Sequence, residues 1–225
     1  METKINIIID FDSTFVQIEA LAKLAEIALE KVPNKERIIK KINYITKMGM
    51  DGQLPFSQSL ATRLKLFQAS KKDIVKLVNL LKKRITPSFI RNRKFFKKHR
   101  DQIYIISGGF VDYIWPVVKP FGIKKKNILT NKFIFNKELI IGFDQKNLLF
   151  QDKGKAKQIQ TLNLKGKIFV IGDGYTDYEI KEMGLADKFF AFCENVRRQT
   201  IVKRADYVIN SFDEFVIFFY GKIVA

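Results

Sequence analysis

Three short apolar runs in this chain each end at a polar residue. They cover residues 5–9 before Asp10, 103–106 before Ser107 and 168–172 before Asp173. Runs of this length, rich in isoleucine, valine and phenylalanine, are typical of parallel strands buried on both faces, and helical patterns follow each of them. The pattern predicts an α/β fold with a Rossmann-like parallel sheet. Ligands of such sheets lie beyond the carboxyl ends of the strands, so Asp10, Ser107 and Asp173 are expected to share one crevice.

The segment between the first two runs is too long for a single crossover and has almost entirely helical spacing. Apolar periodicity predicts helices near residues 18–30, 36–47, 56–67 and 73–83, and Ser70 with Asp73 forms a variant capping box. We therefore expect a helical cap at residues 17–83, inserted into a catalytic core made of residues 1–16 and 84–225.

The return to the core is expected at Thr86-Pro87, where threonine suits a helix cap and proline the first turn. Residues 133–149 alternate irregularly around Asn136, Gly142 and Asn147, which predicts a small β excursion. Strands near 189–192 and 207–209 are expected to complete the sheet, and Ser211 is expected to cap the final helix.

The composition excludes several kinds of catalytic site but does not identify a function. Apolar residues make up 47% of the 225-residue chain, which supports a substantial core, and no apolar run is long enough for a membrane span. Without a recognisable signal peptide, the chain is expected to be cytoplasmic. A single cysteine and a single histidine, His99, make a Cys/His metal site or a Ser-His triad improbable, so catalysis should rest on carboxylates. His99 lies in a basic helical run and is expected at the surface.

The formal net charge of +18 would attract phosphorylated metabolites, nucleic acid or an anionic membrane alike. The lysines occur in short groups along the chain rather than in one basic tail, which favours solvated helix faces over a specific nucleic-acid or membrane site.

Asp10 and Asp12 leave the first strand at alternate positions, which an extended chain points to the same side. Such a pair can divide labour: one ionised carboxylate acts as the nucleophile, and a second with a raised pKa protonates the leaving oxygen and later activates water. Alone, the pair would equally suit a turn or a surface site.

Two further segments suit a phosphate group. Ser107 and Gly108 end the second strand, where a hydroxyl and unhindered amides can cradle phosphate, although an ordinary glycine turn would look the same. The segment Lys153-Gly154-Lys155 offers point charges for phosphate oxygens.

Asp173 and Asp177 lie on a glycine-bent loop after the third strand. Mg²⁺ prefers hard oxygen ligands, so Asp10 and Asp173 are candidates to bind it and Asp177 to orient the surrounding shell. The same segment would also suit a polar turn that caps a helix. Together, in this order, the motifs describe phosphoryl transfer.

The series D-F-D-S-T, S-G-G-F, K-G-K and G-D-G-Y-T-D is similar to the haloacid dehalogenase superfamily, and within it the chain resembles the phosphoserine phosphatase family. The resemblance extends to the segment from Met50 to Phe56 that leads to Arg63, and to the late stretch 195–199. It implies a Mg²⁺-dependent hydrolase of O-phosphoserine in serine biosynthesis, acting through an aspartyl-phosphate.

The resemblance also implies a role for each matched position. Asp10 would be the nucleophile, Asp12 the general acid and base, and the metal would be held by Asp10, the Asp12 carbonyl and Asp173. The positions implied for phosphate are Ser107, Gly108, Lys153 and Thr176; those implied for the rest of the substrate are Glu19 for the amino group, Arg63 for the carboxylate, and Met50 and Phe56 as an apolar lid.

Two other functions remain open at this level. A relative could hydrolyse another small phosphomonoester, or transfer the phosphoryl group to a second alcohol. A basic nucleic-acid-binding protein that has lost catalysis is the alternative from a different class, but loss normally removes a site carboxylate and all four are present. The oligomeric state cannot be inferred.

Overall fold

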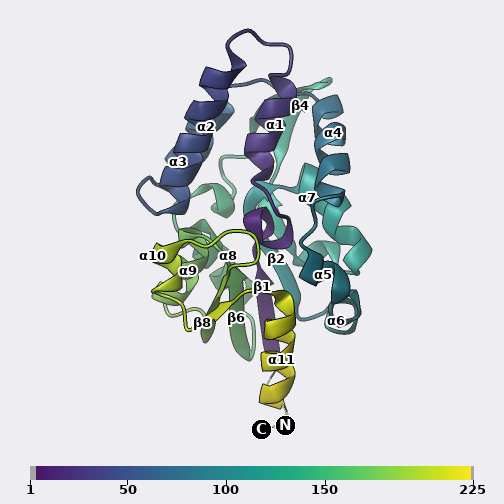
Figure 1. Cartoon of the computed structure of the whole chain (residues 1–225), viewed down its shortest axis with the longest axis vertical. Helices are drawn as coiled ribbons and strands as arrows, with labels where there is room; N and C mark the ends of the chain where they lie inside the picture. The colour runs from purple at the N-terminus through teal and green to yellow at the C-terminus, as the bar shows by residue number, and fades with distance from the viewer. Residues whose placement is uncertain (1–3, 224–225) are drawn as a thin grey trace.

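The computed structural model describes residues 4–223 and centres on a six-stranded parallel sheet (Figure 1). The strands lie in the order β3-β2-β1-β6-β7-β8, so the sequence-adjacent β1 and β2 are neighbours and β6 pairs with the other side of β1. Their bounds are Ile5–Ile9 (β1), Ile103–Phe110 (β2), Ile128–Asn131 (β3), Lys167–Gly172 (β6), Lys188–Phe192 (β7) and Tyr207–Ile209 (β8). This confirms the predicted doubly wound core.

Helices cover both faces of this sheet because side chains of a strand alternate between its faces. Ile7 and Ile9 pack in one cluster with Phe89 and Phe212, whereas Ile8 packs in another on the opposite face. The helices of the first face are α5 (Pro87–Arg91), α6 (Arg93–Lys98), α7 (Val111–Val118) and α11 (Phe212–Ile223); those of the second are α8 (Gly154–Leu162), α9 (Tyr175–Glu182) and α10 (Gln199–Val202). Short helical turns lie at Lys119–Phe121, Lys125–Asn127 and Leu148–Phe150.

Four helices form a cap beyond the carboxyl end of β1, at the top of Figure 1. They are α1 (Ala20–Ala28), α2 (Lys35–Met50), α3 (Phe56–Leu64) and α4 (Lys71–Lys82). All four coincide with predicted helices, and the Ser70–Asp73 capping box is present at the start of α4. Its reciprocal hydrogen bonds satisfy backbone donors that a helix start leaves unpaired.

Two linkers join the cap to the core and pair with each other. Val16 and Ile85 form an antiparallel bridge, and the Thr86 amide donates to the Phe15 carbonyl at 3.0 Å. Thr86 was expected to cap α5, but its hydroxyl makes no cap bond and donates to the Thr14 carbonyl at 2.7 Å instead. The side chain thus fastens one linker to the other.

The predicted β excursion is a two-stranded antiparallel sheet made of β4 (Phe133–Asn136) and β5 (Leu139–Phe143). It reaches the cap, because the amide of Lys71 donates to the Glu138 carbonyl and that of Ile140 to the Ala69 carbonyl, at 2.9 and 3.0 Å.

Three features differ from the sequence-based expectations. Strand β2 continues through Ser107 to Phe110 with a register shift, rather than ending before the glycines, and the short edge strand β3 was not predicted. His99 is half-buried, not at the surface, because its ring packs on Phe95 and Phe219 at centroid distances of 4.4 and 4.9 Å. No helix among residues 4–223 is long and apolar enough to cross a membrane.

Candidate active site

The loop after β1 places Asp10 at the carboxyl end of the sheet. The Asp10 amide donates to the Ile171 carbonyl of β6 at 3.0 Å, so the two strands stay paired up to the point where both loops leave. The next residues form an irregular turn, Phe11–Phe15, in which Asp12 is extended and Ser13 has a φ of 51°. This turn directs the chain from the core into the cap linker.

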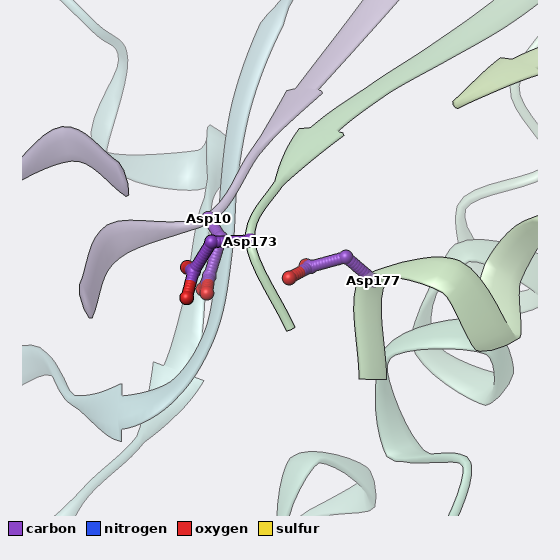
Figure 2. A group of neighbouring side chains, drawn as sticks. All are labelled: Asp10, Asp173 and Asp177. Carbon is purple, nitrogen blue, oxygen red and sulfur yellow. The ribbon is translucent and has the colours of Figure 1, made fainter. Parts of the chain in front are cut away.

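Three buried carboxylates meet at this point. Each of Asp10, Asp173 and Asp177 offers an oxygen within 4.8 Å of the others. Figure 2 shows Asp10 and Asp173 side by side, with Asp177 pointing toward them from the first turn of α9. Gly172 permits this approach, because a Cβ there would lie 2.2 Å from the Asp177 Cγ.

Two cations and a hydroxyl hold the cluster. Lys155 Nζ lies 2.7 Å from Asp10 Oδ1 and 2.8 Å from Asp177 Oδ1. Arg198 Nε donates to Asp173 Oδ2 at 3.1 Å, and Thr14 Oγ1 donates to Asp173 Oδ1 at 3.0 Å. These partners come from three separate segments of the chain.

The electrostatics of the cluster follow from burial and crowding. Burial, with Glu19 and Asp10, raises the pKa of Asp173 to about 8 although Arg198 opposes the shift. Burial and Asp10 raise the pKa of Asp177 to about 7. Burial acts to lower the pKa of Lys155, but Asp10 and Asp177 outweigh it and the pKa rises. Buried acids that repel one another in this way are suited to a bound cation.

The chemistry of these groups fits a divalent metal ion. The cluster offers several carboxylate oxygens, the hard ligands that Mg²⁺ prefers, within a span that one ion can bridge. Asp10 and Asp173 project side by side from adjacent strands, while Asp177 is already engaged by Lys155 and by the Gly174 amide at 3.2 Å. The first two are therefore the better candidates for direct ligands.

The phosphate-side residues line a cavity of about 40 Å³ next to Asp10. Ser107 and Gly108 of β2 and Thr176 of α9 all reach it. The Ser107 hydroxyl accepts the Gly109 amide at 3.0 Å, and a Cβ on Gly108 would lie 2.2 Å from the Phe56 ring. Glycine is needed here so that the cap can approach the strand end.

The structure does not support the assignment of Lys153 to the phosphate site. Lys153 is exposed, has a left-handed backbone with a φ of 57° before α8, and lies beside an outer groove with Tyr175 and Glu179. Lys155, two residues later, lies on the buried side of the first turn and is only 7% exposed. Of the two lysines of the K-G-K motif, Lys155 therefore faces the carboxylate cluster, and the phosphate role of Lys153 stays a prediction.

On the cap side, Asp12, Glu19 and Arg63 line the same cavity. Burial, then Glu19 and Asp10, raises the pKa of Asp12 well above its usual value. Asp12 Oδ1 also accepts the Ala20 amide at 2.7 Å, at the start of α1. A carboxyl group whose pKa is raised by burial is suited to general acid and base chemistry.

Arg63 is buried, and within the part of the chain that the structure describes it has no carboxylate partner. Its Nη1 donates to Thr46 Oγ1 at 3.1 Å and its Nε to the Ser59 carbonyl at 3.3 Å, and among the described residues no acid forms an ion pair with it. Burial lowers the pKa of Arg63, partly offset by Glu19 and Asp12. A buried guanidinium with unused donors is suited to an anionic ligand.

Met50 and Phe56 complete the cavity wall from the cap, and further contacts hold the cap against the core. Asp152 Oδ1 accepts the amide and the hydroxyl of Ser57, at 3.0 and 2.8 Å, at the start of α3. The Tyr175 ring sits against Gly52, where a Cβ would approach it to 2.8 Å. The cap is closed over the cavity.

Several residues at this site were missed or given no role by the sequence alone. Arg198 contacts both Asp173 and Glu19, the latter at 3.7 Å, and Thr14 binds Asp173. Only the local likeness at residues 195–199 pointed to Arg198. No local signal singled out Thr14, because its partner lies 159 residues away.

Carboxylates from the ends of two adjacent parallel strands, bridged to α9 by one buried lysine and covered by an inserted helical cap, define the haloacid dehalogenase class. No family model matches the sequence. The chain is 31% identical over 212 residues to the chloroplastic phosphoserine phosphatase of Arabidopsis thaliana, spanning 92% of this chain and 69% of that protein. It is 32% identical over 210 residues to phosphoserine phosphatase of Homo sapiens, spanning 91% and 88%.

A solved structure agrees with these relatives. A phosphoserine phosphohydrolase-like protein from Francisella tularensis is 30% identical and superposes with a TM-score of 0.84, over 95% of this chain and 98% of that one. The chain therefore belongs to the phosphoserine phosphatase family of the haloacid dehalogenase superfamily.

Proposed function

We propose that this protein hydrolyses O-phosphoserine to serine and phosphate with the help of Mg²⁺. One observation carries the proposal: a single cavity brings Asp10 together with a buried arginine, Arg63, that has no acidic partner among the described residues. Asp10 suits phosphoryl transfer, and Arg63 suits the carboxylate of an amino acid substrate.

In the proposed reaction, the Asp10 carboxylate attacks phosphorus and the ester P–O bond breaks. Asp12, whose pKa is raised, gives its proton to the leaving serine oxygen. Water then attacks the phosphorus of the aspartyl-phosphate and gives a proton to Asp12, which frees Asp10 and restores the acid. Asp10 and Asp12 each act in both steps, and the reaction consumes one water molecule.

The metal would be held by Asp10, the Asp12 carbonyl and Asp173, and would supply positive charge next to the phosphoryl oxygens. Lys155 and the Ser107 hydroxyl would bind the same oxygens, and both line the cavity together with Gly108 and Thr176. Asp177 holds Lys155 in position. Arg198 and Thr14 orient Asp173 by donating to its two carboxylate oxygens, Oδ2 and Oδ1.

Substrate recognition is proposed for the cap side of the cavity. Glu19 would pair with the ammonium group and Arg63 with the carboxylate, while Met50 and Phe56 exclude water. A cavity of about 40 Å³ has room for roughly one water molecule and not for phosphoserine. Access therefore requires the cap, with proposed boundaries at residues 17 and 83, to open on its paired linkers.

Phosphate release from L-phosphoserine by the purified protein, with Mg²⁺ and with excess chelator, tests the proposal. We expect Mg²⁺-dependent release in the wild type and none from Asp10→Asn, because an amide is a poor nucleophile and a weaker metal ligand. Mass spectrometry of quenched wild type should find phosphate on Asp10. Full activity in chelator, or appreciable activity of Asp10→Asn, would refute the mechanism. A cytoplasmic location and the lack of a specific nucleic-acid partner stay predictions.

A further inference from the structure

Tyr113 is a buried residue of the active-site cavity that the proposed reaction leaves without a role. It lies in the first turn of α7, just after the strand end that carries Ser107, and its side chain is fully buried. The rings of Phe11 and Phe110 pack against it at centroid distances of 6.2 and 6.1 Å and fix its orientation. It lines the cavity together with Asp12, Glu19 and Arg63.

The Tyr113 hydroxyl has no hydrogen-bond partner among the described residues. Only three buried side-chain atoms there share this property; the other two are the amide oxygens of Asn6 and Asn131. Both of those atoms are acceptors, so among these three atoms of the described residues the Tyr113 oxygen is the one that carries a proton to donate. Burial raises the pKa of Tyr113, and the Phe110 amide only opposes that rise. Because an amide N–H is a donor, it offers no acceptor for the phenol proton.

An unpaired buried donor destabilises a protein, and a phenylalanine would fill the same space without that cost. A hydroxyl in this place is therefore suited to donate to an acceptor atom of a bound ligand. Its position is known from Gly109: a Cβ on that glycine would lie 2.8 Å from the Tyr113 oxygen and 3.2 Å from the Ser107 oxygen. The Tyr113 hydroxyl thus lies near Ser107, at the edge of the proposed phosphate site.

The surrounding charges indicate which part of a substrate it faces. Besides burial, which raises the pKa of Tyr113 well above its usual value, the charges that act on the phenol are Asp12, Arg63 and Glu19. Tyr113 in turn acts on the pKa of Arg63. These are the cap-side groups, placed around the amino acid portion of the proposed substrate. A donor beside a guanidinium completes a site for a carboxylate, not for an ammonium.

We propose that the Tyr113 hydroxyl donates a hydrogen bond to the carboxylate of the bound substrate and so makes Tyr113 a second specificity-determining residue beside Arg63. The inference rests on the proposed phosphoserine phosphatase activity, which it deepens. It assigns carboxylate recognition to a residue of the core, on α7, as well as to the cap.

The test compares Tyr113→Phe with wild type on two substrates that differ by one group. L-phosphoserine and O-phosphoethanolamine share the phosphate and the ammonium, and only the first has a carboxylate. We expect kcat/KM of Tyr113→Phe to fall about 10- to 100-fold for phosphoserine, the loss typical of a hydrogen bond to a charged group. For phosphoethanolamine kcat/KM should stay within about twofold of wild type. Tyr104→Phe, on the far part of β2 and outside the cavity, is the matched control and should leave both values unchanged.

Thermal unfolding of the ligand-free proteins gives a second readout. Because the hydroxyl is unpaired, Tyr113→Phe should melt at the same temperature as wild type or higher. A lower melting temperature would show that the hydroxyl has a partner in the free protein and would overturn the inference.

The kinetic outcomes separate this inference from the proposed function. Equal losses on both substrates would place the hydroxyl against the phosphate or ammonium, and no loss on either would remove it from substrate recognition; both results overturn the inference alone. A wild type that does not hydrolyse phosphoserine would overturn the proposed function, and the carboxylate role with it.

Discussion

Lys155→Met is the substitution that most directly tests the site. The sequence favoured Lys153 as the phosphate-binding lysine, whereas Lys155 is the lysine that contacts Asp10 and Asp177 in the structure. Methionine keeps most of the apolar stem and removes the charge. Lys155 Nζ lies 2.7 and 2.8 Å from Asp10 and Asp177, and the residue is 7% exposed. The change therefore leaves two buried carboxylates facing each other without their shared cation.

The structural cost can be bounded. Removing one partner of a buried ion pair typically costs about 3–5 kcal/mol of unfolding free energy. The cost should fall near the lower end of that range, because the pKa of Asp177 is about 7 and this acid can take up a proton instead. A domain with a stability of about 5–15 kcal/mol stays folded after such a loss.

The catalytic cost is of similar size in free energy. A preorganised donor aimed at a transferring group in a dry site is worth about 10²- to 10³-fold in kcat, so we expect a loss of that size for Lys155→Met. Lys153→Met is the matched control. It removes the same charge from an exposed position two residues away. The folding equilibrium constant and kcat should each change by no more than about twofold.

Phosphate release and urea unfolding of the two variants and wild type measure both effects. A hundredfold loss in Lys153→Met beside a nearly normal Lys155→Met would refute the reasoning, since the family position and not the observed ion pairs would then identify the phosphate lysine.

Three further outcomes are expected. Arg63→Ala should lower kcat/KM for phosphoserine by about one to three powers of ten and change that for an aryl phosphate little, as expected when a charge-assisted contact is lost; equal losses would mean that Arg63 only holds the cap together. His99 has a pKa below its ordinary value, mainly through burial, so the folded protein binds fewer protons than the unfolded chain. The contribution of His99 to stability should be complete above about pH 6.5 and should fall as the pH drops through the folded pKa. The urea midpoint of His99→Phe should therefore depend less on pH in that window than the midpoint of wild type. An identical pH dependence of the two midpoints would contradict this. Asn195 Nδ2 donates to the Ser13 carbonyl and to Thr86 Oγ1, at 3.1 and 2.7 Å, and so joins both cap linkers. Asn195→Ala should speed hydrogen exchange at the Thr86 amide while sheet amides keep their protection, and unchanged exchange at Thr86 would exclude this clamp.

Local signals were enough for the secondary structure that carries the site. The strands at residues 5–9 and 168–172 are runs of apolar residues that a doubly covered parallel sheet requires, whatever their partners. The Ser70–Asp73 capping box acts within one turn, so it too could be predicted from neighbouring residues. The order of the acidic motifs along the chain then predicted that Asp10 and Asp173 would meet at one sheet edge.

Tertiary structure decided what depends on orientation or on distant partners. Residues Ser107 to Phe110 look like a glycine turn in isolation, but β2 continues through them and pairs with the unpredicted edge strand β3 at Ile106 and Phe110, on either side of the irregular part. Lys153 and Lys155 are chemically identical, and only the left-handed start of α8 turns one outward and the other onto Asp10.

The same holds for the groups that surround the reacting carboxylates. The sequence by itself determined which side chains could do phosphoryl transfer, because nucleophile, acid and metal ligands are fixed by residue type. It did not determine that Arg198 would reach Asp173, or that the Tyr113 hydroxyl would be buried without a partner. Those facts arise where segments far apart in the chain pack together, and no local pattern of residues encodes the distance between them.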